Sequence, residues 1–136
     1  MFPAKQKRRV CRLIVNPIDS VWFGELHFEE WIVSRLAQLQ HMLAAEPDDL
    51  FLNYALGMEY QKTGDSNAAL AQFAAMNHRF PDHVAAWHQR GRLLVDLGDH
   101  PAACEILKHG VSVAGRVGDS HAAGEMQGLL DVIAAE

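Results

Sequence analysis

Apolar residues recur every third or fourth position through most of the chain, and each such stretch ends at a turn signal. The clearest stretch carries Leu52, Leu56 and Tyr60, which fall on one face of a helix. Gly64-Asp65 ends it, because glycine tolerates the left-handed conformation at a helix C-terminus and an acidic residue suits the start of the next helix. Along the chain, the pattern predicts helices over about 33–46, 49–63, 66–79, 83–97, 100–116 and 120–135. We therefore expect an all-α protein.

Two of these helix pairs are copies of one another at an offset of 34 residues. Leu56-Gly57-x-x-Tyr60 returns as Arg90-Gly91-x-x-Leu94, and Gly64-Asp65 returns as Gly98-Asp99. Gly57 is expected to face Ala69, so that the two helices of a pair approach closely. Because one helical hairpin cannot bury its apolar face alone, we expect such units to stack on one another.

This pattern resembles the tetratricopeptide repeat of small bacterial proteins. In that family a large residue stands three places before Leu-Gly, a Tyr follows, and an Ala, an aromatic residue and a closing Pro come further on. The matching positions are Leu56, Gly57, Tyr60, Ala69, Phe73 and Pro81 in the first copy, and Trp87, Gly91, Leu94, Ala103 and Leu107 in the second. Asn53 takes the place of Trp87 in the first copy, and Arg90 stands where the family has an apolar residue.

The flanking segments read as partial units. The stretch Val33 to Glu46 carries an apolar stripe of Leu36, Leu39, Met42 and Leu43 and closes with Pro47-Asp48, as Pro81-Asp82 closes the first copy. It therefore reads as a second helix without its first. The stretch 120–135 reads as a capping helix. The resemblance implies a right-handed α-α superhelix of antiparallel helix pairs, built from a half-repeat, two repeats and a cap.

Composition and charge narrow the functional classes. The 136 residues are 49% hydrophobic and carry a net charge of −5. From Val33 onward the chain has more acidic than basic residues, which argues against nucleic acid as a ligand of the repeat domain. No apolar run approaches the roughly 20 residues of a membrane span. Cys11 and Cys104 do not suggest a disulfide framework, so a cytoplasmic setting is expected.

Residues 1–32 lack the repeat pattern, and three interpretations stay open. The segment is disordered or loosely docked, or its basic stretch Lys5 to Arg12 is a functional arm that contacts nucleic acid or an acidic lipid surface. Alternatively, it comes from an over-extended reading frame. Glu29-Glu30 requires a purine-rich GARGAR hexamer, which lies two codons before Val33, and the codon of Val33 can be the alternative bacterial start GUG.

The residues that could carry chemistry do not form a known arrangement. His78, His83 and His88 suggest a metal-binding regulator, but His83 and His88 are five apart and do not share a helical face. There is no Cys-x-x-Cys and no His-Glu-x-x-His motif. Cys104 is expected to be a structural thiol. We expect no catalytic residue, no metal and no cofactor, and the chain is not predicted to be an enzyme.

The resemblance implies that the first helix of each pair lines a concave groove. With Leu56, Gly57 and Tyr60 packed inward, the side chains expected to face this groove are Phe51, Tyr54, Met58, Gln61 and Lys62, with their counterparts His88, Gln89, Arg92 and Asp96. The predicted function is binding of an unidentified protein, through a peptide or a partner helix held in the groove, with Arg92 available to a carboxylate. The alternative is a homodimer that buries Leu36, Leu39 and Met42 of the half-repeat.

Overall fold

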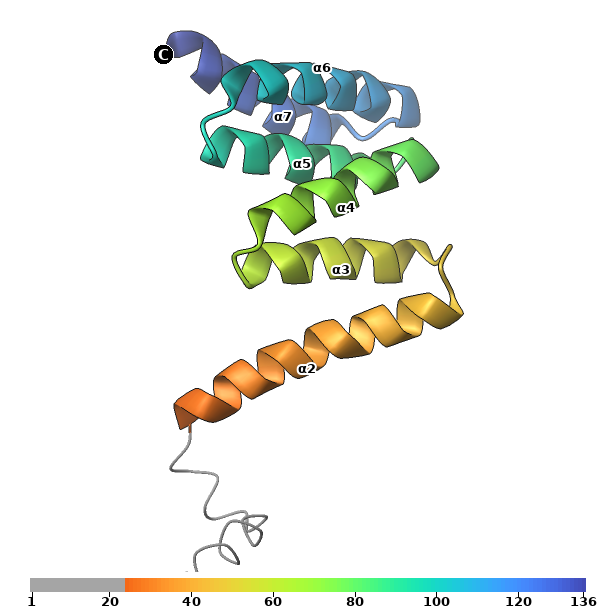
Figure 1. Cartoon of the computed structure of the whole chain (residues 1–136). Helices are drawn as coiled ribbons and strands as arrows, with labels where there is room; N and C mark the ends of the chain where they lie inside the picture. Colours follow the sequence, from red (N-terminus) through yellow and green to blue (C-terminus); the bar gives the residue numbers. More distant parts are fainter. Residues whose placement is uncertain (1–23) are drawn as a thin grey trace, which may run out of the picture. The chain divides into compact units, whose positions relative to one another are not determined.

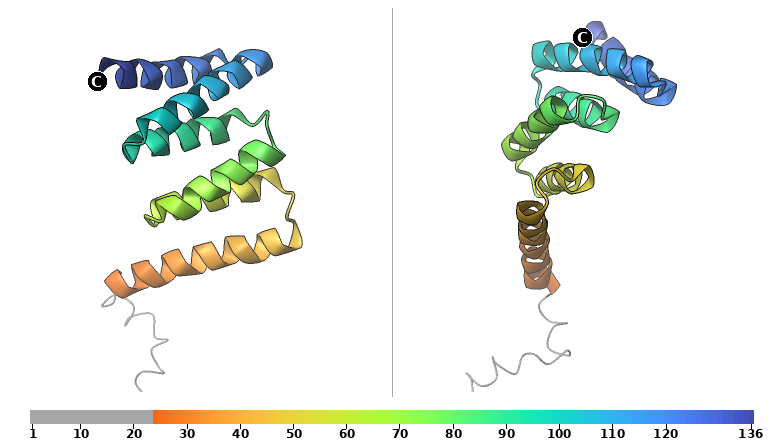
Figure 2. Two further views of the ribbon diagram at one scale, coloured as in Figure 1. Left: turned by 45° about the horizontal axis from the view of Figure 1, so that its top comes forward. Right: turned by 90° about the vertical axis from the view of Figure 1, so that its right-hand side faces the viewer.

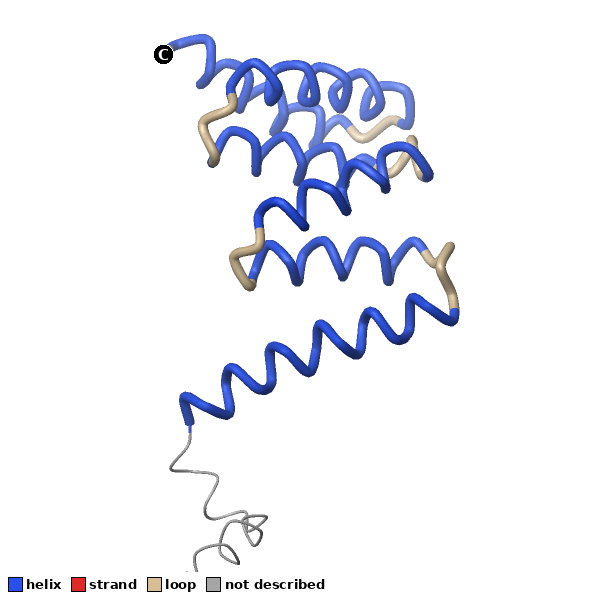
Figure 3. The backbone as a smooth tube through the Cα atoms, in the orientation of Figure 1, coloured by secondary structure: helices blue, strands red, loops and turns tan. Residues whose placement is uncertain are grey.

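The computed structural model of the protein describes residues 24–136, with side chains from Arg35 onward. It has six α-helices and no strand within this range (Figure 3). Their bounds are α2 Gly24–Ala45, α3 Leu50–Lys62, α4 Ser66–Arg79, α5 Val84–Asp96, α6 His100–Val117 and α7 Ser120–Ala135. The all-α prediction is confirmed, and the bounds of α3 to α7 lie within one residue of the predicted ones.

The chain divides into two compact units, Met1–Ala37 and Gln38–Glu136. The helical repeats lie in the second unit, in which α3 pairs with α4, and α5 pairs with α6 (Figure 1). The helix α7 packs against both α5 and α6. The right-hand view of Figure 2 shows α3 and α5 on the same side of α4.

The first helix begins at Gly24, so the predicted start at Val33 is wrong. That prediction followed the loss of the apolar stripe, and a stripe marks the buried face of a helix, not its length. No Gly or Pro stands between Glu25 and Glu46, so this stretch contains no helix breaker. The interpretations of the basic segment Lys5 to Arg12 and of Cys11 fall outside the described residues. The interpretation of the reading frame stays a prediction.

Aspartate side chains cap four of the helices. The Oδ1 atom of Asp49 accepts a hydrogen bond from the backbone N–H of Leu52 at 2.7 Å. The three other capping aspartates, which make the same bond to the residue three places on, are Asp65, Asp99 and Asp119. Each cap satisfies one backbone donor and places a negative charge at the positive end of a helix dipole. Much of the acidic charge of the domain therefore has a structural role.

Glycine brings the two helices of each repeat together. A Cβ atom added to Gly57 would lie 2.7 Å from Cε1 of Phe73, and one added to Gly91 would overlap the side chain of Leu107. Phe73 and Leu107 are both completely buried. The predicted close approach is confirmed, although the side chain nearest to Gly57 is that of Phe73, not that of Ala69.

The two repeats are equivalent in detail at the position where their sequences differ most. Nε1 of Trp87 donates a hydrogen bond to the carbonyl oxygen of Pro81 at 2.9 Å. In the first repeat Nδ2 of Asn53 donates to the carbonyl oxygen of Pro47 at 3.0 Å. Both side chains are buried, and both reach the proline six residues earlier in the chain. The offset of 34 residues therefore holds for individual contacts as well as for the helices.

Replacing Gly91 tests the close approach. We expect Gly91→Ala to lower the free energy of unfolding by about 1–3 kcal/mol, because the new methyl group overlaps Leu107 in a filled core. The measurement is urea denaturation at 25 °C, followed by circular dichroism. Gly124→Ala on α7 is the matched control. Nothing lies within 4 Å of that site, so helix propensity alone should stabilise this variant, by about 0.5–1 kcal/mol. Equal effects of the two substitutions would contradict the packing argument.

Candidate functional site

The nine residues predicted to face the groove lie on α3 and α5, and none of them is buried. We call this surface the α3/α5 face. Its exposed members are Phe51, Met58, Lys62, Arg92 and Asp96, and its partly buried members are Tyr54, Gln61, His88 and Gln89. The ring of Phe51 is the most exposed apolar side chain of the described residues, at 75%. The core positions Leu56 and Leu94 of the same helices are buried.

Tyr54 is held more firmly than the sequence suggests. Its ring centroid lies 6.0 Å from that of Phe73 and 5.3 Å from that of His83, with the ring of His83 edge-on at 75°. Tyr54 therefore forms part of the wall between α3, α4 and the start of α5. Its truncation would disturb the core, so Phe51, Met58 and Arg92 are cleaner positions for testing this face.

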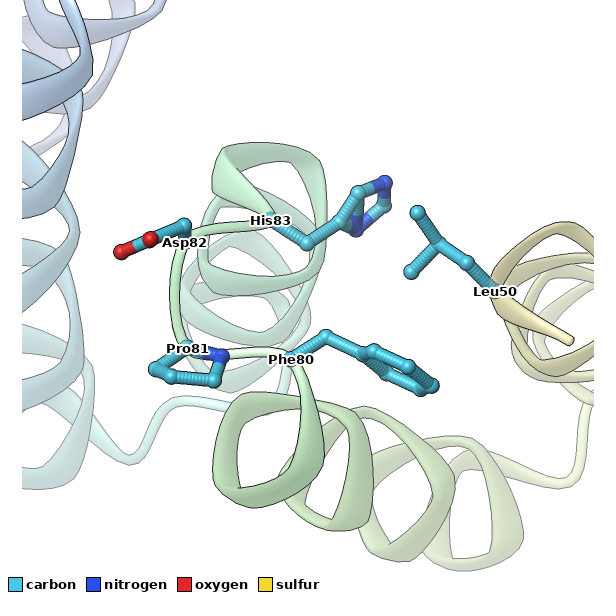
Figure 4. A pocket seen from close by; sticks show the side chains of 5 residues that line it. All are labelled: Leu50, Phe80, Pro81, Asp82 and His83. Carbon is cyan, nitrogen blue, oxygen red and sulfur yellow. The ribbon is translucent and has the colours of Figure 1, made fainter. Parts of the chain in front are cut away.

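An open pocket of about 370 Å³ adjoins Phe51. It is lined by Leu50 at the start of α3 and by Phe80, Pro81, Asp82 and His83 of the turn between α4 and α5 (Figure 4). Figure 4 shows the rings of His83 and Phe80 on one side and the side chain of Leu50 opposite them. The sequence analysis missed this pocket. Phe80 and Pro81 had been read only as the end of a repeat.

The second repeat has no equivalent of this pocket among the described residues. Val84 is the counterpart of Leu50, and it is 8% exposed whereas Leu50 is 39% exposed. Val84 packs in one cluster with Val113 and Ala114 of α6. The helix α6 runs to Val117, four residues beyond the counterpart of Arg79, where α4 ends. The longer helix supplies the side chains that cover the site in the second repeat.

The walls of the pocket carry no uncompensated charge. Burial lowers the pKa of His83 below its usual value near 6.5, because a charged imidazole is poorly solvated there. The histidine is therefore neutral at neutral pH. The carboxylate of Asp82 forms an ion pair with Arg116. Asp48 forms the corresponding ion pair with Arg79 in the first repeat.

The charges on α5 are distributed differently from those of the rest of the domain. His88, Arg92 and Asp96 are each four residues apart and lie along one stripe of the helix. Arg90 points elsewhere, and its Nη1 donates a hydrogen bond to Oδ1 of Asn77 at 3.2 Å. Burial lowers the pKa of Arg90, and the charge of Glu105 partly opposes this effect. Its expected approach to Glu105 is thus confirmed.

The alternative sites receive little support from the geometry. Within residues 24–136, no three His, Cys, Asp or Glu side chains are grouped so that they could hold a metal ion. His78, His83 and His88 are therefore not brought together. Cys104 is partly buried against the core of the second repeat. None of the described helices is long and apolar enough to span a membrane.

The half-repeat is partly covered by its own chain. Leu39 is buried, and Nε2 of Gln40 donates a hydrogen bond to the hydroxyl of Tyr60 at 3.1 Å. Leu43 is partly buried and Met42 is half exposed. The homodimer through this helix stays a prediction.

These observations define a helical-repeat protein in which the first helix of each pair presents an open face. Comparison with known proteins agrees, because residues 84–116 match the family model of the tetratricopeptide repeat. A TPR repeat-containing protein of Pseudomonas aeruginosa is 30% identical over 92 residues, which cover 68% of this chain and 88% of that protein. The chain belongs to the tetratricopeptide repeat family.

Solved structures show the same fold. The solution structure of a tetratricopeptide repeat domain protein from Salinibacter ruber is similar with a TM-score of 0.61 and 29% identity, over 64% of this chain and 88% of that one. The crystal structure of PcrH in complex with the chaperone-binding region of PopD has a TM-score of 0.70 at 14% identity, over 91% and 93% of the two chains. The predicted fold class is confirmed.

The buried position of His83 makes a prediction about pH. Because the pKa of His83 is lower in the folded protein than in the unfolded chain, the unfolded chain binds more protons below pH 6.5. The contribution of this residue to stability is therefore complete above about pH 6.5 and is lost as the pH falls through the folded pKa. We expect wild type to lose stability relative to His83→Gln between pH 7.5 and pH 5.5, as measured by urea denaturation. The other histidines titrate in both proteins and cancel. A constant difference between the two proteins would show that His83 is not desolvated.

Proposed function

We propose that the protein is a non-catalytic interaction module whose α3/α5 face binds an extended peptide or a helix of another protein. The observation that carries this proposal is the exposure of Phe51 beside the pocket formed by Leu50, Phe80 and His83. Exposed apolar surface is unfavourable in water by about 25 cal/mol per Å², and concentrated apolar patches mark interaction sites.

The other side chains of the α3/α5 face suit recognition of a peptide. Met58 is exposed and flexible, so it can adapt to partner side chains of different shape. Gln89 offers donors and acceptors to a peptide backbone, and Arg92 offers a planar guanidinium to a carboxylate. The face therefore combines apolar contact with groups that can orient a bound segment.

The structural comparison supports the same mode of binding. PcrH, which shares the fold, was solved in complex with a segment of another protein, the chaperone-binding region of PopD. The family resemblance places the groove on the first helix of each pair, and here those helices are α3 and α5. The identity of the partner is a separate question, because the likeness to PcrH concerns the fold alone.

Photo-crosslinking in cells tests the proposal. A full-length chain with Phe51→p-benzoylphenylalanine should form a discrete crosslinked product with another protein, because position 51 is exposed beside the pocket. The matched control places the same residue at Lys108, which is exposed on α6. Products should be weaker in a chain that also carries Met58→Ala and Arg92→Ala.

The pattern of products distinguishes the hypotheses. A product of twice the chain mass, formed from position 51 or from Met42, would favour the homodimer instead. Equal products from positions 51 and 108 would count against a binding site on the α3/α5 face.

A further inference from the structure

We infer that the partner segment carries a large apolar side chain, which enters the pocket between Leu50 and His83, and an acidic residue about four positions away, which pairs with Arg92. This inference rests on the proposed function, because both contacts lie on or beside the α3/α5 face. It adds the chemistry of the partner, which the fold does not supply.

The pocket selects an apolar occupant. Leu50, Phe80 and Pro81 supply apolar surface. The only carboxylate in the lining is that of Asp82, and it is already paired with Arg116. The volume of about 370 Å³ is near the lower end of the range of about 300–1,000 Å³ for small-ligand sites, so it suits one large side chain. Interfaces are commonly anchored by a single buried side chain of this kind.

Only one anchor of this kind is expected. The equivalent place in the second repeat is filled, because Val84 packs against Val113 and Ala114 of the longer helix α6. The partner therefore does not need a second apolar residue at the spacing of one repeat. This asymmetry places the apolar contact at the start of α3 and α5.

The charge of the face selects an acidic residue. Arg92 is exposed and forms none of the ion pairs found in the described part of the chain. The acidic residues that could have balanced it are used elsewhere. Asp49, Asp65, Asp99 and Asp119 cap helices, and Asp48 and Asp82 pair with arginines. An exposed guanidinium binds a carboxylate through two parallel hydrogen bonds.

The spacing follows from helix geometry. His83 immediately precedes α5, and Arg92 lies nine residues further on. At 1.5 Å per residue, this separation is about 13.5 Å along the helix axis. An extended peptide advances about 3.3 Å per residue, so it covers the distance in about four residues. The two contacts can therefore be made by one short segment.

Peptide display on the full-length chain tests the inference. We expect selection from a random peptide library to enrich sequences with a large apolar residue and an Asp or Glu about four positions away. With Arg92→Glu, the enriched peptides should carry Lys or Arg at the acidic position and keep the apolar residue. With Leu50→Gln, they should lose the apolar residue and keep the acid. Lys108→Glu, a charge reversal on α6, is the matched control and should leave the consensus unchanged.

A synthetic peptide from the wild-type selection gives a quantitative check. Its affinity for Arg92→Glu should be lower by about tenfold or more than its affinity for wild type, and its affinity for Lys108→Glu should be unchanged. The inference is wrong if the acidic position persists in the Arg92→Glu selection, or if the apolar position persists in the Leu50→Gln selection. Circular dichroism of each variant confirms that the loss is not caused by unfolding.

The same peptides separate this inference from the proposed function. Enriched peptides that block crosslinking from position 51 but lack the apolar and acidic pair would overturn the inference and leave the binding face in place. Absence of enriched peptides, or peptides that leave the crosslinking from position 51 unchanged, would overturn both.

Discussion

The close approach of the two helices within each repeat is the constraint on which the rest of the structure depends. Because Gly57 and Gly91 have no side chain, Phe73 and Leu107 reach the backbone of the opposing helix and are completely buried there. Many small dispersion contacts are made at such a site, and a filled interior does not accept an added methyl group. The contact fixes how α3 and α5 are rotated about their own axes. The surface that is left open for a partner is therefore a consequence of the core.

The acidic character of the domain reflects folding more than recognition. Aspartates begin α3, α4, α6 and α7, and each accepts a hydrogen bond from the helix that it starts. Two further aspartates, Asp48 and Asp82, pair with arginines near the ends of α4 and α6. Net charge is thus a poor guide to the ligand. The charge of the α3/α5 face has to be considered separately, and there Arg92 is exposed without a counterion among the described residues.

The two repeats share their architecture and differ at one end. The buried nitrogen donors of Asn53 and Trp87 reach equivalent proline carbonyls, so the core repeats closely even where the sequence does not. The extra turn of α6 then covers Val84, whereas the earlier end of α4 leaves Leu50 beside an open pocket. A difference in the length of one helix therefore gives the first repeat a binding feature that the second lacks.

The sequence by itself determined the helices, their pairing and the residues of the α3/α5 face. Turn signals such as Gly64-Asp65 act locally, and helical periodicity sets the direction of each side chain, so both can be read without coordinates. The start of α2 could not be read in this way, because its first turns carry no stripe. Only the tertiary structure decided that Leu50 and His83, 33 residues apart, form one pocket, and that the ring of Tyr54 is held by Phe73 and His83. Such features depend on where one helix stops relative to its neighbour, and that position is set by packing between segments distant in the chain.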